Sequence, residues 1–450
     1  MRLTKPDLYF VLILSGGLLL RIFTLIGIDI EPDSYTYLEG TITLINLDYN
    51  SIRPPGFPLL IVPFYLLTGN GKISIKLTSF VFSILGLICS YFIFTNASHN
   101  LHKRHSKKDS IRSKYVGLLV SFFLAFNLYL VNNSGRGLRE EIMMVICMFV
   151  FYIVVVKEKH VLRDNLSLAL LIALLSLTHL TAGMFLTLGM VLYSILSRLK
   201  RFRFTPLSLK SLLLIIVSFL ITFFLWAIYS NFQFGDPFYN WHNHGNTFKI
   251  KYNIDLSTLE NILKAFINAI IFGIPSELIY LGALSSFVFI GMAIYLVLKN
   301  LKQKQFLFIF LTVGVSFAYL SIFMTIPRVL LYLLPFIFYL GAISIGFTMN
   351  EFKDLKTPFQ KKMIYLLVLF LICYILRGID AMAIIFSFYQ IYEFIPCFCN
   401  YDVIANQFFI PMSIVRLIYN IIVALIIEVS LSIHLLRAKY LEYYIISSGS

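Results

Sequence analysis

Apolar runs recur along the chain, each roughly 15–25 residues long and each followed by a short charged cluster. A helix of that length crosses the hydrocarbon core of a bilayer. Hydrophobic residues make up 59% of the 450 positions and charged residues only 13%, which is more apolar surface than a soluble domain can bury. The strand-like alternation of a membrane β-barrel is missing. We therefore predict an all-α polytopic membrane protein.

The basic clusters between the runs determine the predicted topology, because Lys and Arg favour cytoplasmic loops. The net charge of +15 is concentrated in these loops, so topology explains it better than nucleic-acid binding does. Keeping every cluster on one side gives about 12 transmembrane helices with both termini in the cytoplasm. The first span, Leu8–Ile28, has no small-residue cleavage site after it and is expected to be retained.

This topology divides the chain into two regions, and no separate soluble domain is expected. Residues 1–348 form the predicted catalytic module, and residues 349–450 add C-terminal spans. Three external segments interrupt them: loop 29–72, a mobile loop 231–265, and segment 377–410.

Three local expectations depend on the same topology. The short stretch 55–69 contains Pro58 and Pro63 and is predicted to be an external juxtamembrane helix rather than a span. The run 166–196 is predicted to fold into a hairpin that turns at 178–181. The remaining predicted spans are 73–94, 115–131, 140–156, 208–230, 275–297, 306–324, 329–348, 362–376 and 411–436, with NNSGRGLREE as the external connection between 115–131 and 140–156.

Ionisable residues from distant parts of the chain are expected on the external face. They are Glu31, Asp33, Arg53, Arg136, Glu140, Glu141, His179, Asp236, His242, His244, Lys249, Lys251 and Arg328. A transporter would bury such groups at the middle of its spans, and the span centres here carry few. Glu428, the main exception, is expected near the cytoplasmic end of its span.

Four stretches resemble the GT-C class of integral-membrane glycosyltransferases, closest to its protein O-mannosyltransferase and aminoarabinose-transferase branch. They are PDSYTYLEGTITL (32–44), RPPGFPLLIVPFYLLTG (53–69), FGDPFYNWHNHGNTFKIKYN (234–253) and IPRVLLYLLPFIFYLGA (326–342). The resemblance implies a GT-C-like bundle with external juxtamembrane helices after the first span. It also implies a polyprenyl-phosphate-linked sugar donor.

The resemblance implies that Asp33 is the catalytic base, which deprotonates the acceptor so that the anomeric centre inverts. The alternative is that Asp33 only caps the helix that follows it. Arg53 and Arg328 are the expected donor-phosphate ligands, since guanidinium binds phosphate bidentately. Both arginines could instead be interfacial anchors. Relatives often have an acid just before the basic-Pro-Pro run, where this chain has Ile52.

Three further acids are candidates for an assisting or metal-binding role. Glu31 precedes Asp33, and a solvated loop acid is the alternative. Glu140 and Glu141 begin a predicted span, where the resemblance implies a second acidic site. Acids at a helix N-terminus also complement the helix dipole, which is the alternative for this pair. No cofactor is certain, and a divalent cation stays open.

The external loop supplies the expected mobile substrate contacts. They are Trp241, His242, His244 and Lys249. A His-x-His pair can bind a metal or a phosphate, and Trp241 can stack on a sugar. Histidines in such loops are also often merely solvated, and aromatic residues anchor loops at the headgroups.

We therefore expect a glycosyltransferase in the plasma membrane of a bacterium or archaeon, with its active site on the non-cytoplasmic face. The partners are the lipid-linked donor, membrane lipids and a glycan, lipid or protein acceptor, with no nucleic acid. The alternatives are a lipid-linked-oligosaccharide flippase or other transporter, and an O-antigen-type polymerase. The chain has no WWD-type motif, which disfavours an oligosaccharyltransferase.

Overall fold

The structure is a computed structural model that describes residues 4–101, 107–157, 161–199, 207–239, 267, 287–323 and 327–351. Every element in these residues is a helix, which confirms the all-α prediction. The elements are α1 (Lys5–Gly27), α2 (Pro32–Ile45), α3 (Gly56–Thr68), α4 (Gly71–Leu101), α5 (Lys107–Ala125), α6 (Leu128–Arg136), α7 (Glu140–Phe151), the π-helix η1 (Tyr152–Val156), α8 (Leu162–Thr178), α9 (Leu180–Ser197), α10 (Leu209–Phe234), α14 (Phe287–Lys299), α15 (Lys304–Phe323), the 3₁₀ helix η3 (Pro327–Leu333) and α16 (Leu334–Glu351).

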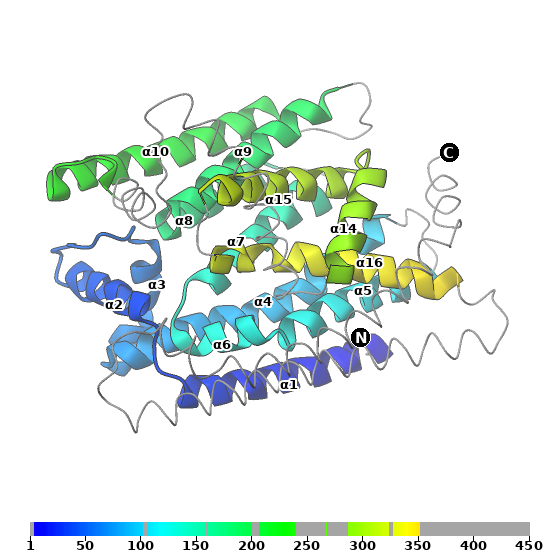
Figure 1. The fold of residues 1–450 in the computed structure, drawn as a ribbon, viewed down its shortest axis with the longest axis horizontal. Coiled ribbons are helices and arrows are strands. Elements are labelled where there is room, and N and C mark those ends of the chain that lie inside the picture. Colours follow the sequence, from blue (N-terminus) through cyan, green and yellow to red (C-terminus); the bar gives the residue numbers. More distant parts are fainter. Residues whose placement is uncertain are drawn as a thin grey trace.

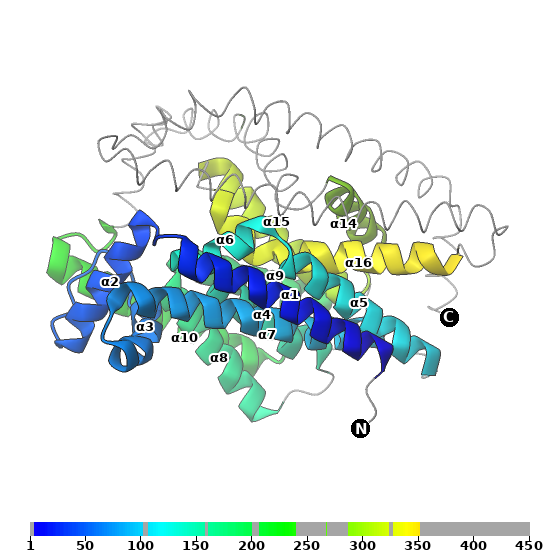
Figure 2. The same ribbon diagram turned by 90° about the horizontal axis from the view of Figure 1, so that it is seen from below.

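Several of these helices are long and apolar enough to cross a bilayer. Within the described residues they are α1, α4, α9 and α10, and the bent pair α5–α6 would make a fifth span. The long helices lie side by side with nearly common axes (Figures 1 and 2). The polytopic character is therefore confirmed, while the total of about 12 spans stays a prediction. The spans predicted at 362–376 and 411–436, with segment 377–410 between them, lie outside the described residues.

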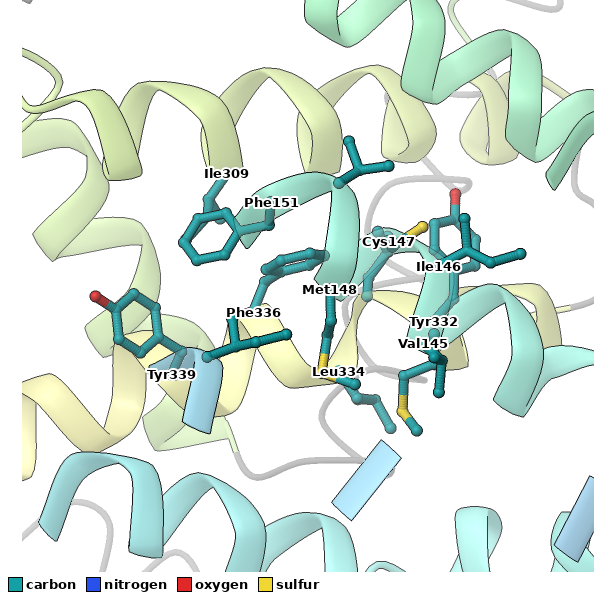
Figure 3. Packing of buried hydrophobic residues seen from close by; sticks show 14 of the residues in the cluster. Val145, Ile146, Cys147, Met148, Phe151, Ile309, Tyr332, Leu334, Phe336 and Tyr339 are labelled. Carbon is teal, nitrogen blue, oxygen red and sulfur yellow. The ribbon is translucent and has the colours of Figure 1, made fainter. Parts of the chain in front are cut away.

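Helix α7 forms the centre of the bundle. All of its residues except Phe149 are buried. Such a helix is apolar on every side beyond its first turn, which is the pattern of a helix enclosed by others. Figure 3 shows its side chains packed against η3, α16 and α15, with the Phe151 ring 5.5 Å from that of Phe336. The packing fixes α7, and with it the two acids at its start.

The short stretch after the first span forms the predicted non-spanning helix. Helix α3 has 13 residues and contains Pro63. At 1.5 Å per residue it extends only about 20 Å, which is too short to cross the hydrocarbon core. Helices α2 and α3 lie beyond one end of the bundle, and the end of α10 that leads to Gly235 reaches the same end (Figures 1 and 2). We call this the α2–α3 end.

The hairpin predicted from the run 166–196 is also present. Helix α8 ends at Thr178 and α9 begins at Leu180. His179 lies between them, and its Nδ1 accepts a hydrogen bond from the backbone N–H of Ala182 at 3.3 Å. His179 is therefore the N-cap of α9, a role that explains this side chain without a substrate.

The connection predicted at NNSGRGLREE differs from the structure. Helix α5 breaks after Ala125, and α6 starts at Leu128 and continues to Arg136, bent by 59° from α5. Asn127 caps α6 by accepting from the backbone N–H of Leu130, and Gly137 ends it with φ of +73°. The polar residues of α6 looked like a loop, but Asn132, Asn133 and Ser134 are buried inside the bundle.

Arg21 lies against the end of α5 and is a buried ionisable group within the first predicted span. Its side chain lies within α1 and is 1% exposed. The guanidinium donates to the Ser83 hydroxyl at 2.7 Å and to the carbonyls of Gly17, Leu124 and Ala125 at 2.9–3.1 Å. Because the last carbonyls of a helix lack intrahelical partners, Arg21 completes the end of α5 within the bundle.

Candidate functional site

Asp33 does not cap helix α2. The helix begins at Pro32, and Glu31 occupies the N-cap position without a side-chain capping bond. Proline at the first helical position is favoured because its missing N–H would have no intrahelical partner there. Asp33 is thus the second residue of the helix, and its side chain is 38% exposed. The capping alternative for Asp33 is wrong.

The carboxylate of Asp33 pairs with Arg53. Oδ1 of Asp33 lies 3.3 Å from Nη2 of Arg53, which belongs to the connection between α2 and α3. The Arg53 side chain is only 18% exposed, and its Nε is buried with no hydrogen-bond partner within the described residues. The guanidinium lies against the first turn of α2. One of its five N–H donors contacts Asp33 through Nη2.

Glu31 is held by a different arginine. Its Oε2 lies 2.7 Å from Nη1 of Arg136, the last residue of α6. The Glu31 backbone N–H also donates to the Arg136 carbonyl at 3.1 Å. The hydroxyl of Ser34, fully buried, lies 2.9 Å from the carbonyls of Arg136 and Gly137. These bonds latch the start of α2 to the end of α6, and we call them the α2–α6 latch.

Tyr37 lies one helical turn after Asp33 and joins the charged groups of this end. Its ring is 2% exposed and packs edge-to-face on Phe57 of α3 at 5.0 Å. The guanidinium carbons of Arg53 and Arg139 lie 5.9 Å and 5.4 Å from the ring centroid. Burial raises the pKa of the Tyr37 phenol, and the nearby Arg139 and Arg53 oppose that rise. Sequence reasoning missed Tyr37, although its i+4 spacing from Asp33 places both on one face of a helix.

The two adjacent acids of α7 have different surroundings. Glu140 and Glu141 both lie in the first turn of α7 and are both buried. Glu140 interacts electrostatically with Tyr37, as Asp33 does. Glu141 interacts instead with Arg21 of α1. We therefore define the Tyr37 cluster as Asp33, Tyr37, Arg53, Arg139 and Glu140, and place Glu141 in the bundle interior. Both acids lie in the first turn of α7, so each can also complement the dipole of that helix, as the alternative states.

The RPPGFP stretch brings α3 against the α8–α9 turn. A Cβ at Gly56 would lie 2.5 Å from the carbonyl carbon of Leu177, so only glycine allows this approach. Nη1 of Arg139 donates to the carbonyl of Thr178 at 3.1 Å, at the same turn. The starts of α3 and α7 thus meet the end of α8 beside the Tyr37 cluster.

Arg328 belongs to the 3₁₀ helix η3, whose residues pack along α7. In Figure 1 the start of α16, which η3 precedes, lies toward the α2–α3 end. The convergence of Arg328 on Asp33 stays a prediction. The predicted loop contacts Trp241, His242, His244 and Lys249 lie outside the described residues.

A metal site is not evident in the part of the chain that the structure describes. No three His, Cys, Asp or Glu side chains of these residues come together as metal ligands would. Of the candidate metal or assisting acids, Glu31 pairs with Arg136, Glu140 interacts electrostatically with Tyr37, and Glu141 interacts electrostatically with Arg21.

Two solved structures share the fold of this chain. The crystal structure of ArnT from Cupriavidus metallidurans bound to undecaprenyl phosphate is 16% identical, with a TM-score of 0.52 over 97% of this chain and 73% of ArnT. The apo structure of the same protein is 12% identical, with a TM-score of 0.50 over 84% of this chain and 72% of ArnT. No family model matches the sequence, and no curated protein does. ArnT is an aminoarabinose transferase of the GT-C class. The similarity to ArnT therefore confirms the resemblance expected from the sequence, at the level of the fold.

Proposed function

We propose that this protein is an inverting glycosyltransferase. It moves a sugar from a polyprenyl-phosphate-linked donor to an acceptor on the external face of the membrane. The observation that carries the proposal is the Asp33–Arg53 pair, partly exposed at the α2–α3 end of a bundle with the ArnT fold. Undecaprenyl phosphate, bound in the ArnT structure, is a lipid of the proposed donor class.

Asp33 acts as the base in this reaction. Its carboxylate takes the proton of the acceptor hydroxyl while the acceptor oxygen forms a bond to the anomeric carbon. The bond from that carbon to the phosphate oxygen breaks on the opposite face, and its electron pair leaves with the polyprenyl phosphate. The neighbouring guanidinium of Arg53 holds the Asp33 carboxylate in position through a charge-assisted hydrogen bond.

Arg53 also binds the departing phosphate. The charge on the phosphate increases as the bond breaks, and a guanidinium with a remaining donor stabilises that charge. A guanidinium carries five N–H donors, more than the bond of Nη2 to Asp33 uses. Arg328 is the proposed second phosphate ligand, and the residues of the loop after α10 (Trp241, His242, His244 and Lys249) are proposed substrate contacts.

A transporter is less well supported by the same residues. Arg21 is the arginine buried within a described span, and four protein acceptors already hold its guanidinium. That arrangement gives Arg21 a structural role and no carrier role.

The test is Asp33→Asn in protein purified in lipid nanodiscs and supplied with a panel of undecaprenyl-phosphate sugars. We expect sugar release from the donor to fall at least 100-fold while undecaprenyl phosphate still binds, since the amide cannot accept the proton. Glu39→Gln is the matched control, because Glu39 is an exposed acid of the same helix. Full activity of Asp33→Asn would overturn the assigned base, and no binding of undecaprenyl phosphate to the unmodified protein would overturn the donor class.

A further inference from the structure

We propose that Tyr229 of α10 is a positioning residue that holds Arg53 against Asp33. The inference rests on the proposed function, because it assigns Arg53 a role in donor binding. It concerns the end of α10 that reaches the α2–α3 end of the bundle (Figure 1).

The Tyr229 hydroxyl fastens the connection between α2 and α3. It accepts a hydrogen bond from the backbone N–H of Ser51 at 3.0 Å. It also lies 3.2 Å from the carbonyls of Tyr49 and Ser51, either of which can take its proton. One hydroxyl thus serves as acceptor and donor to the same short segment.

The segment that Tyr229 fastens in turn holds the backbone of Arg53. The Tyr49 hydroxyl donates to the Arg53 carbonyl at 2.6 Å, and the Arg53 N–H donates to the Ser51 hydroxyl at 3.2 Å. A continuous chain of contacts therefore leads from Tyr229 through Tyr49 and Ser51 to Arg53, and from its guanidinium to Asp33.

The first half of the same connection is held differently. The backbone N–H groups of Asn46 and Asp48 donate to carbonyls of the last turn of α2, and that of Asn50 donates to the Thr43 hydroxyl. The half that carries Arg53 depends on Tyr49 and Tyr229, whose rings lie 5.6 Å apart. Gln233, one turn after Tyr229, adds a bond from its amide to Oδ1 of Asn50 at 2.8 Å.

The residues after α10 return onto the same helix end. Gly235 ends α10 with φ of +70°, and the Ser230 hydroxyl donates to the Asp236 carbonyl at 2.7 Å. The ring of Tyr239 stacks on that of Phe234 at 4.6 Å. The entry to the external loop is therefore built onto the helix turns that carry Tyr229, so α10 connects that loop to Arg53.

The experiment compares Tyr229→Phe, Arg53→Met and the double variant by the affinity of each for undecaprenyl phosphate. Tyr229→Phe keeps the ring and removes only the hydroxyl, with the bond it accepts and the bond it donates, so its affinity should fall about 5- to 10-fold. The double variant should bind no more weakly than Arg53→Met, because Tyr229 acts through Arg53. Tyr9→Phe, an exposed tyrosine of α1, is the control and should bind as the unmodified protein does.

A purely structural role would weaken binding equally with and without Arg53, and that additive result would overturn the inference. Tyr49→Phe gives a second route, since it removes the bond to the Arg53 carbonyl directly and should give the same non-additive pattern. Amide hydrogen exchange needs no ligand, and Tyr229→Phe should speed exchange over residues 49–53. Unchanged exchange there would also overturn the inference. If the unmodified protein fails to bind undecaprenyl phosphate, the proposed donor class is wrong. The exchange result then still decides whether Tyr229 holds residues 49–53.

Discussion

The guanidinium of Arg53 and the carboxylate of Asp33 form one ion pair, 3.3 Å apart, although they come from different segments. Asp33 lies in the first turn of α2, and Arg53 lies in the connection that leads to α3. In their proposed roles of base and phosphate ligand, these two touching groups would act as a unit. A change at one of them alters the charge and the position of the other.

Arg53→Lys keeps the charge of this pair and loses the fork of donors. A lysine ammonium cannot hold Asp33 and chelate a phosphate with the same planar geometry. We expect the affinity for undecaprenyl phosphate to fall about 10-fold and sugar release to fall further. The control is Arg163→Lys, an exposed arginine of α8, measured by the same titration. Unchanged affinity in Arg53→Lys would show that charge alone suffices.

Glu31→Gln tests whether the α2–α6 latch is structural. The pair with Arg136 is mostly buried, with side chains 22% and 18% exposed, so its loss should lower the free energy of unfolding by about 1 kcal/mol. Sugar release at a temperature well below denaturation should change little, because the Arg136 carbonyl still accepts from the Glu31 backbone N–H. The measurement is the denaturation midpoint together with the initial rate. A large loss in the rate of sugar release at an unchanged denaturation midpoint would instead support an assisting or metal-binding role for Glu31.

The positions of the helices could be predicted from the sequence because an apolar run of roughly 15–25 residues has the length of one helix that crosses a bilayer. The α8–α9 hairpin was expected to turn at 178–181, and α9 begins at Leu180. The short helix α3 was predicted from its length and its prolines. In contrast, the sequence predicts a loop over the polar run 132–136. Its burial depends on α1 and α4, which pack against α6 and come from distant parts of the chain.

The candidate site could be predicted in part. The pairing of Asp33 with Arg53 joins two predicted residues, yet the sequence could not show that Arg136 takes Glu31. Neighbouring residues of a helix point about 100° apart, and Glu140 interacts electrostatically with Tyr37 while Glu141 does so with Arg21. Which acid faces the Tyr37 cluster depends on how α7 is rotated within the bundle, and that rotation is set by tertiary packing.

The separation of these two acids gives a matched pair of variants. Glu140→Gln should lower sugar release at least 10-fold with little effect on the denaturation midpoint, since Glu140 belongs to the Tyr37 cluster. Glu141→Gln should instead leave sugar release nearly unchanged and lower the denaturation midpoint, because it removes the carboxylate charge that interacts electrostatically with the buried Arg21.

The double variant Glu141→Gln with Arg21→Met tests whether the two residues interact or contribute independently to the free energy of unfolding. Its cost in unfolding free energy should be smaller than the sum of the single costs, because no unpaired charge is left inside the bundle. Some cost should remain, since the carbonyls of Leu124 and Ala125 lose their donor. Strict additivity would contradict the assigned interaction.

Gly56→Ala tests the close approach of α3 to the α8–α9 turn. The added Cβ would lie 2.5 Å from the carbonyl carbon and 2.7 Å from the carbonyl oxygen of Leu177, and backbone cannot move aside as a side chain can. We expect a cost of about 1–3 kcal/mol and weaker binding of undecaprenyl phosphate, because a shifted α3 also shifts Arg53. Gly291→Ala on α14, where nothing lies within 4 Å of an added Cβ, is the control. Equal stability of the two variants would mean that α3 yields without cost.

Tyr37 predicts how stability changes at alkaline pH. Burial raises the pKa of this phenol above that of an unfolded tyrosine, which is about 10. Below that pH the phenol is neutral in both states, and its contribution to stability is fully present. Above it the unfolded chain loses the proton first, so the contribution is lost as the pH rises toward the folded pKa. Tyr37→Phe cannot ionise in either state, and the stability of the unmodified protein relative to this variant should therefore decline between pH 9 and about pH 11. Denaturation midpoints of both proteins, measured in one detergent across that range, check the sign. A difference that stays constant with pH would show that the Tyr37 hydroxyl is accessible to hydroxide in the folded protein.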